Sequence, residues 1–180
     1  TGQSSIMKMF PIWAKELGLD AEIKGIDLPN VCTAPEIIMG EKKISGKIVA
    51  VIGSGMTGLE TTEILNESGN HVVVVEMAEE IAPGTWFQLK DDELSRIQKY
   101  DTEFMPGKRL MKITEDSVIL EDVRTSMLTT VTVDEVVLSL GVRPVNALAK
   151  ALENQYPYVV TVGDACKSGR IADAVHSAYD

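Results

Sequence analysis

The residues best suited to chemistry in this sequence are three glycines and one acid. Gly53, Gly55 and Gly58 form a Gly-x-Gly-x-x-Gly pattern, and Glu76 follows the third glycine by 76 − 58 = 18 positions. In a dinucleotide-binding turn the first glycine permits a sharp bend, the second lets the backbone lie against a pyrophosphate, and the third lets a helix pack closely on a sheet. An acid about 20 residues further on holds the hydroxyls of the adenosine ribose. The four residues therefore predict a dinucleotide site.

The segments around these residues have the pattern that such a site needs. Residues 48–52 are all apolar and mostly β-branched, which predicts a strand buried on both faces. A helical run extends from Met56 to about Ser68, and a second strand over 71–76 ends on the acid. The N-terminus of a helix offers free N–H groups and a positive dipole end to phosphates. We expect the phosphates to be bound by the backbone N–H groups of Ser54, Gly55, Met56 and Thr57.

The residues after Glu76 indicate which dinucleotide is bound. No Lys or Arg occurs between Glu76 and Gly84. NADP(H) carries a 2′-phosphate that proteins accommodate with a nearby cation, and NAD(H) lacks that group. The sequence therefore favours NAD(H) over NADP(H).

The remaining segments predict an α/β fold. Residues 110–133 contain short alternating runs separated by acidic turns, which is typical of an antiparallel β-meander. Thr33 and Glu36 form a capping-box pattern at the start of a short helix that Gly40 ends. The sequence thus predicts a Rossmann-like three-layer domain with a parallel sheet and an antiparallel β-meander crossover. Further helices are expected over 12–17, 85–100, 146–154 and 170–179, and further strands over 101–105, 134–141 and 156–164.

Other residues that could carry chemistry have structural interpretations. In the helix expected over 85–100, we interpret Trp86 as a core anchor rather than a residue that stacks on a cofactor. Cys32 and Cys166 lie far apart in the sequence, which predicts two reduced thiols instead of a redox pair. Neither His71 nor His176 has a setting that favours acid–base catalysis. We therefore expect no catalytic side chain and no metal site in this chain.

Composition and charge exclude several classes of protein. The formal net charge of −10 argues against a nucleic-acid partner, because phosphate binding needs concentrated Lys and Arg. No apolar run approaches the ~20 residues that span a bilayer, and the start has no signal-peptide pattern. We expect a cytoplasmic protein without a membrane partner. The chain begins at Thr1 without Met and ends within a helical pattern, so we expect it to be a piece of a longer protein.

Four segments resemble the NAD(P)H-binding domain of the pyridine nucleotide–disulfide reductase superfamily of flavoproteins. Residues 47–76 are similar to the family's NAD(P)H fingerprint, and residues 136–144 are similar to the strand and glycine through which the chain returns to the FAD domain. Thr1-Gly2 resembles the end of an Ala-Thr-Gly signature, and residues 160–164 resemble the second FAD motif.

Within that superfamily, the sequence most resembles old-yellow-enzyme-like NADH:flavin oxidoreductases. This group includes 2-enoate reductase, 2,4-dienoyl-CoA reductase and trimethylamine dehydrogenase. The motifs that carry this resemblance lie in residues 74–83 and 163–176. The resemblance implies that NADH reduces FAD, and that electrons pass through an iron–sulfur cluster to FMN in a barrel domain.

The resemblance also implies a division of the chain and further site residues. Residues 1–30 would end the first half of an FAD domain, 31–145 would form the NAD(P)H-binding domain, and 146–180 would begin the second FAD half. Glu60 would face the nicotinamide–flavin junction, unless it is simply a solvated carboxylate. Gly141 would leave room for the nicotinamide, and Gly163 with Asp164 would contact FAD. The first FAD fingerprint, the cluster cysteines and the barrel have no counterpart here, so we expect the isolated chain to lack turnover.

Two other functions remain open at this point, and a third is disfavoured. An S-adenosylmethionine-dependent methyltransferase also uses a glycine turn and an acid after the second strand, although its usual acid before the glycines is replaced by Val51 and Ile52. A non-catalytic dinucleotide sensor or interaction module could share the fold. A phosphate-loop NTPase is disfavoured because Leu59 follows Gly58 where a Lys is required.

Overall fold

The computed structural model describes residues 28–179, and these divide into two compact units after Ser139. The helix expected over 12–17 lies outside the described residues, as does the resemblance at Thr1-Gly2. The domain boundary expected at residue 145 remains a prediction.

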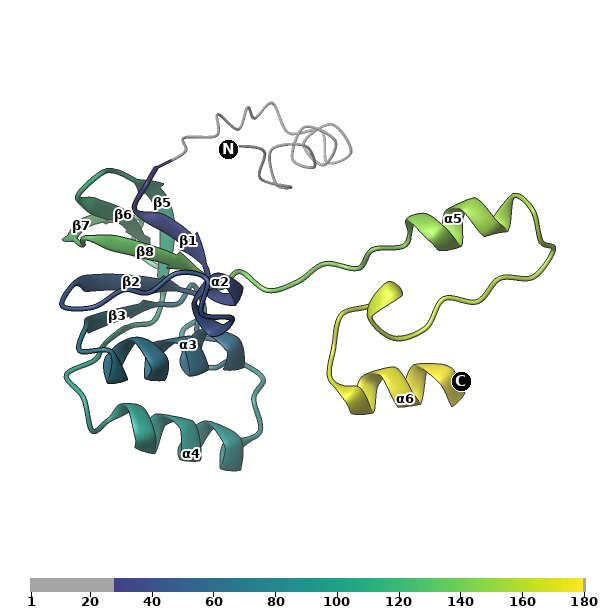
Figure 1. The fold of residues 1–180 in the computed structure, drawn as a ribbon, viewed down its shortest axis with the longest axis horizontal. Helices are drawn as coiled ribbons and strands as arrows, with labels where there is room; N and C mark the ends of the chain where they lie inside the picture. Colours follow the sequence, from purple (N-terminus) through teal and green to yellow (C-terminus); the bar gives the residue numbers. More distant parts are fainter. Residues whose placement is uncertain (1–27, 180) are drawn as a thin grey trace. The chain divides into compact units, whose positions relative to one another are not determined.

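The first unit is built on a five-stranded parallel sheet (Figure 1). The strands follow the order β1-β8-β2-β3-β4, and every neighbouring pair is parallel. The central strands are apolar and β-branched, as expected of strands covered on both faces. Their bounds are β1 Val31–Thr33, β2 Ile48–Ile52, β3 His71–Val75, β4 Glu103–Met105 and β8 Glu135–Leu138.

Helices cover one face of this sheet. The helices are α2 Ala34–Ile38, α3 Met56–Glu67 and α4 Phe87–Ile97. Alternate strand residues, among them Val49, Val51 and Val74, join Leu65 of α3 in one buried cluster. At α2 the expected capping interaction is present, since the Glu36 carboxylate accepts the Thr33 N–H at 2.7 Å. No helix in the described part of the chain is long and apolar enough to cross a membrane.

A three-stranded antiparallel meander covers the other face. Its strands are β5 Lys108–Ile113, β6 Ser117–Asp122 and β7 Leu128–Thr132. The intervening sheet residues, such as Ile52 and Val75, pack with Val118 and Leu120 of β6. The expected three-layer architecture, with a parallel sheet and a β-meander crossover, is therefore confirmed.

The interpretation of Trp86 as a core anchor is wrong. Its side chain is 71% exposed, whereas Ile97 is fully buried with Leu59 and Ala82. The helix begins one residue later than the tryptophan, so Trp86 lies outside the helical repeat that sets the inward face. That face instead carries Glu93 and Ile97, four residues apart.

The second unit contains helices but no strand within its described residues. They are α5 Ala147–Glu153, a 3-10 turn over Gly163–Ala165 and α6 Ile171–Tyr179. The strand expected over 156–164 is wrong, since residues 156–162 have no regular secondary structure. A strand is stabilised by a hydrogen-bonded neighbour, and the described part of this unit offers none. Tyr158 and Val160 are accordingly exposed.

The different settings of Ile97 and Trp86 can be tested by truncation. We expect Ile97→Ala to lower the free energy of unfolding by about 2–5 kcal/mol, because it leaves a cavity between α3 and α4. Trp86→Ala, the matched control at the other end of α4, should change it by about 0.5 kcal/mol or less. Urea unfolding curves of both variants measure this. A larger loss for Trp86→Ala would mean that its side chain is buried.

Candidate functional site

The turn between β2 and α3 depends on two glycines for steric reasons. Gly53 has a φ of +101°, and a Cβ there would lie 2.3 Å from the carbonyl oxygen of Ser139. A Cβ at Gly58 would lie 2.1 Å from the carbonyl oxygen of Gly53. Real Cβ atoms do not come so close to backbone oxygens. The two glycines therefore let the helix start directly against the ends of β2 and β8.

Gly55 differs from its two neighbours in the pattern. A Cβ built there would meet no heavy atom within 4 Å, and its φ of −59° suits any residue. Gly55 is the N-cap of α3, and it is exposed. The first turn of a helix leaves N–H groups without partners inside the helix, and its dipole is positive there. The space beside Gly55 is thus open, and it lies in front of a helix end that favours an anion.

Glu76 is joined to this turn by hydrogen bonds. Its Oε2 atom accepts the N–H of Ser54 at 2.9 Å and the hydroxyl of Ser54 at 2.8 Å. Its Oε1 atom accepts the N–H of Ala78 at 2.8 Å. The fully buried Ser54 hydroxyl in turn accepts the N–H of Ala82 at 2.9 Å. One carboxylate therefore connects the glycine turn, the end of β3 and the loop that follows β3.

The surroundings of Glu76 keep it ionised. Burial raises the pKa of its carboxyl, but hydrogen bonds donated by Ala78, Ser54 and Met77 outweigh that effect and leave the pKa below its ordinary value. At neutral pH the group is a carboxylate and can only accept hydrogen bonds.

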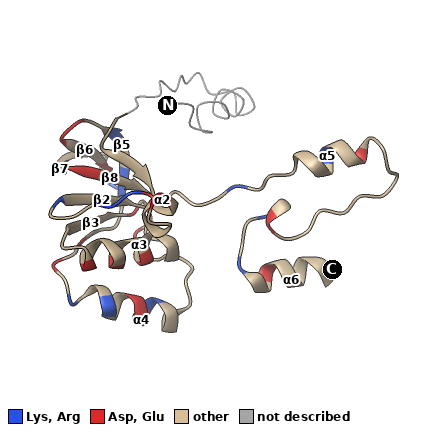
Figure 2. Ribbon diagram, in the orientation of Figure 1, with Lys and Arg blue, Asp and Glu red and all other residues tan. Residues whose placement is uncertain are grey.

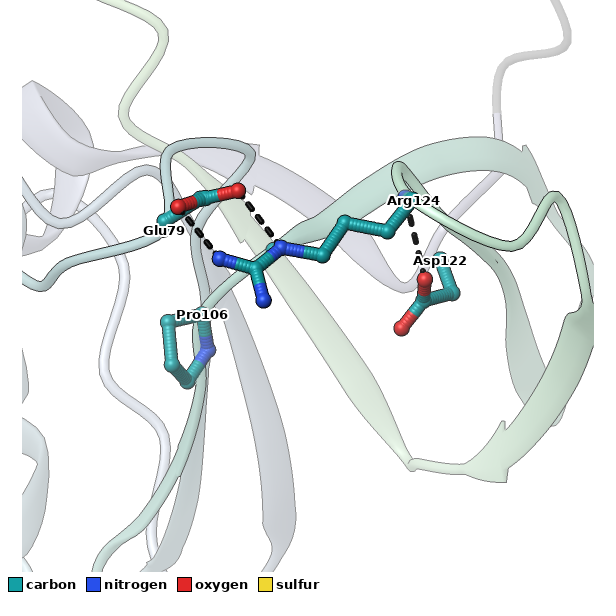
Figure 3. A pocket seen from close by; sticks show the side chains of 5 residues that line it. Glu79, Pro106, Asp122 and Arg124 are labelled. Carbon is teal, nitrogen blue, oxygen red and sulfur yellow. Dashed lines mark hydrogen bonds and ion pairs between the residues drawn. The ribbon is translucent and has the colours of Figure 1, made fainter.

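The residues after β4 form hydrogen bonds with the backbone of the loop that follows β3. The N–H of Gly107 donates to the carbonyl of Ala78 at 2.7 Å, and the N–H of Lys108 donates to the carbonyl of Glu76 at 2.8 Å. Beside these bonds lies a hollow of about 230 Å³ at the surface, lined by Glu79, Pro106, Gly107, Asp122 and Arg124 (Figure 3). Arg124 reaches across it from the turn between β6 and β7 to pair with Glu79 (Figure 3). We did not anticipate this arginine from the sequence, because it lies 45 residues from its partner.

The expected phosphate donors are placed together, with one correction. Met56 and Thr57 occupy the first turn of α3, next to Gly55. The Ser54 N–H, however, is already bonded to Glu76, so it is not free to bind a phosphate. The expected phosphate donors are thereby reduced to the N–H groups of Gly55, Met56 and Thr57 at the N-terminus of α3.

The other expected site residues lie on α3 and in the second unit. Glu60 is exposed on α3. Gly141, Gly163 and Asp164 all belong to the second unit, where the N–H of Gly163 donates to Ser177 Oγ at 2.8 Å and Asp164 Oδ1 accepts the N–H of Gly169 at 3.1 Å. Over residues 28–179, no group of His, Cys, Asp and Glu side chains could hold a metal ion.

Both cysteines are free thiols, as expected. Cys32 is buried in β1, and burial raises the pKa of its thiol to about 11. It is therefore protonated at neutral pH and unsuited to thiolate chemistry.

These features define a class of protein: a Rossmann-like domain with a glycine turn, a helix N-terminus and an acid at the carboxyl edge of a parallel sheet. Residues 12–162 match the family described as pyridine nucleotide-disulphide oxidoreductase. The chain belongs to this family, which confirms the resemblance found in the sequence. The similar proteins include reductases, in keeping with the old-yellow-enzyme-like group that the sequence indicated.

Known relatives are oxidoreductases of greater length. Bilirubin reductase of Mediterraneibacter gnavus (strain CC55_001C) is 36% identical over 160 residues, covering 87% of this chain and 24% of the relative. NADH oxidase of Thermoanaerobacter brockii is 32% identical over 161 residues, covering 87% and 25%. The structure of 6-hydroxypseudooxynicotine amine oxidase from Pseudomonas geniculata N1 shares the fold, with a TM-score of 0.75 at 24% identity over 88% of this chain and 25% of that one.

This chain therefore spans about a quarter of the length of the curated relatives described. It is an oxidoreductase-family domain of the kind found in flavin-dependent oxidoreductases. Membership in this family favours a pyridine nucleotide over S-adenosylmethionine as the ligand.

The close approach at Gly58 makes a prediction about stability. An alanine inside a helix is ordinarily more stable than a glycine by about 0.5–1 kcal/mol. Here we expect the opposite sign, with Gly58→Ala lowering the free energy of unfolding by at least about 1 kcal/mol, because the new Cβ collides with backbone. Gly55→Ala is the matched control and should stay within about 1 kcal/mol of wild type. Urea unfolding decides, and a stabilised Gly58→Ala variant would contradict the packing described.

The lowered pKa of Glu76 makes a prediction about pH. Because the folded pKa is below the unfolded one, the carboxylate stabilises the fold above the unfolded pKa of about 4.3 and loses this effect as pH falls through the folded pKa. We expect Glu76→Gln to be less stable than wild type at about pH 7, with a difference that shrinks toward about pH 3. Urea unfolding at several pH values measures the difference. A constant difference would show that the pKa of Glu76 is not lowered by folding.

Proposed function

We propose that this domain binds NADH, with the pyrophosphate at the glycine turn and the adenosine ribose at Glu76. The observation that carries the proposal is the open Cβ position of Gly55 in front of the N-terminus of α3, next to a residue that is hydrogen-bonded to Glu76. Packing alone explains why positions 53 and 58 are glycine. It does not explain the glycine at position 55, because a Cβ there would meet no heavy atom within 4 Å. A glycine is needed there if the backbone must lie directly against a pyrophosphate.

The residues of this chain would act by binding and orienting the cofactor. The N–H groups of Gly55, Met56 and Thr57 would donate to the pyrophosphate, aided by the dipole of α3. Glu76 is ionised at neutral pH, and its Oε1 atom, which accepts one N–H from Ala78, can accept a second donor from a ribose hydroxyl. Both groups are held in place by Ser54, so little has to be ordered on binding.

The charges around the ribose position support NADH over NADPH. Glu76, Glu79 and Glu80 lie within five residues of one another on the loop after β3. Glu79 and Glu80 are each paired with a cation, whereas the recorded partners of Glu76 are N–H and hydroxyl donors. A 2′-phosphate would therefore meet the negative charge of Glu76, and like charges that lie close together repel. The name of the NADH oxidase relative is in keeping with this preference.

We further propose that the domain positions NADH for a flavin held in the longer parent protein. When bound, the nicotinamide supplies a hydride and the flavin accepts it. Glu60 and Gly141 would lie near the nicotinamide half, and Gly163 with Asp164 would contribute to the FAD site together with parent residues. The isolated chain would then bind the nucleotide without turnover.

The openness at Gly55 provides the test. We expect Gly55→Val to raise the Kd for NADH at least about tenfold, because the side chain would occupy the space of the pyrophosphate and block its charge-assisted bonds. The free energy of unfolding should change by about 1 kcal/mol or less, since nothing surrounds the new side chain. Fluorescence titration with NADH and urea unfolding measure the two quantities. Unchanged NADH affinity in a folded variant would contradict the proposal.

A further inference from the structure

The structure brings an arginine to the loop that carries the ribose-binding acid. Residues 77–83 contain no Lys or Arg, which favoured NAD(H) in the sequence. Yet Arg124 lies against this loop, with its Nε atom 2.6 Å from Glu79 Oε1 and its Nη2 atom 2.5 Å from Glu79 Oε2. The guanidinium is therefore held by both oxygens of one carboxylate (Figure 3).

The turn that carries Arg124 is itself well anchored. Asp122 Oδ1 accepts the N–H groups of Arg124 and Thr125 at 3.0 and 2.9 Å, and Oδ2 accepts from Lys108 Nζ at 2.9 Å. These bonds, with the ion pair to Lys108 foremost, hold the pKa of Asp122 well below its usual range. The N–H of Val123 also donates to the carbonyl of Gly107 at 2.9 Å. These bonds fix the backbone of Arg124, whereas its long side chain can change conformation.

The Glu79–Arg124 pair is connected to Glu76 by a short series of bonds. Ala78, the residue before Glu79, donates its N–H to Glu76 and accepts the N–H of Gly107. Gly107 and Arg124 line the same hollow. The Glu79–Arg124 pair therefore lies on the same loop as the acid proposed to hold the ribose, three residues further along the chain.

We propose that Glu79 acts as a latch on Arg124 and so sets the selectivity between NADH and NADPH. The proposal rests on the proposed dinucleotide site. With the latch closed, both oxygens of Glu79 engage the arginine, which is then not available to a 2′-phosphate. With Glu79 removed, Arg124 is released and can bind a 2′-phosphate through its forked N–H groups.

The charge distribution supports a latch that can open. The side chains of Arg124 and Glu79 are 70% and 61% exposed, so water and salt weaken the pair. A 2′-phosphate carries more negative charge than one carboxylate and offers more acceptor oxygens. Lys108 and Arg109 of β5 pair with Asp122 and Glu121 of β6, so these two cations of the meander are already engaged (Figure 2).

The test compares the affinities of the full chain for NADH and NADPH. Glu79→Gln should raise the ratio of Kd(NADH) to Kd(NADPH) by roughly tenfold, as expected for a released charge-assisted interaction with phosphate. The double variant Glu79→Gln/Arg124→Gln should return the ratio to about the wild-type value. Glu80→Gln is the matched control, because it removes the same charge from the same loop but releases Lys90 of α4 instead. It should change the ratio by less than about twofold.

Several outcomes would overturn the latch. An equal shift in Glu80→Gln, or a shift that persists in the double variant, would show that loss of negative charge alone changes selectivity. An unchanged ratio in Glu79→Gln, with NADH still bound by wild type, would refute the latch and leave the proposed dinucleotide site standing. Failure of the wild-type chain to bind either nucleotide would refute both.

Discussion

The hydrogen bonds between Ser54 and Glu76 are the constraint on which the rest of the site depends. They join the turn after one parallel strand to the end of the next, and a third bond to Ala82 extends the connection into the following loop. A buried serine hydroxyl and a partly buried carboxylate would be costly without partners, so the cluster is stable only when all its members are in place. The position of the helix end relative to the acid is therefore set before any ligand arrives.

The layers of the fold explain why this edge is rigid. The parallel strands are covered by helices on one face and by the meander on the other, so β2 and β3 have no freedom to shift in register. The meander also contributes chemistry, since its β6–β7 turn brings Arg124 to the loop after β3. Under the proposals above, the crossover would both fill the core and set the selectivity of the nucleotide site.

Much of this arrangement could be predicted from local sequence. The strand over 48–52, the helix from Met56 and the meander follow from apolar periodicity, and the steric roles of Gly53 and Gly58 follow from their spacing. The errors concern long-range context. Trp86 was assigned to the core because the helix was expected from residue 85, whereas it begins two residues later, at Phe87. Residues 156–162 have a strand-like composition but no strand to pair with in the described part of the second unit. The hydrogen bond from the Ser54 N–H to Glu76 and the ion pair between Arg124 and Glu79 are tertiary contacts that no local sequence pattern encodes.

The central claim is that the N-terminus of α3 and Glu76 together receive a dinucleotide. The most direct measurement is a two-dimensional ¹H–¹⁵N NMR titration of the chain with NADH. We expect saturable shifts of the amide signals of Gly55 to Gly58, together with those of Met77 and Ala78, which follow Glu76. Saturable shifts elsewhere, with the amides of Gly55 to Gly58 unmoved, would contradict it.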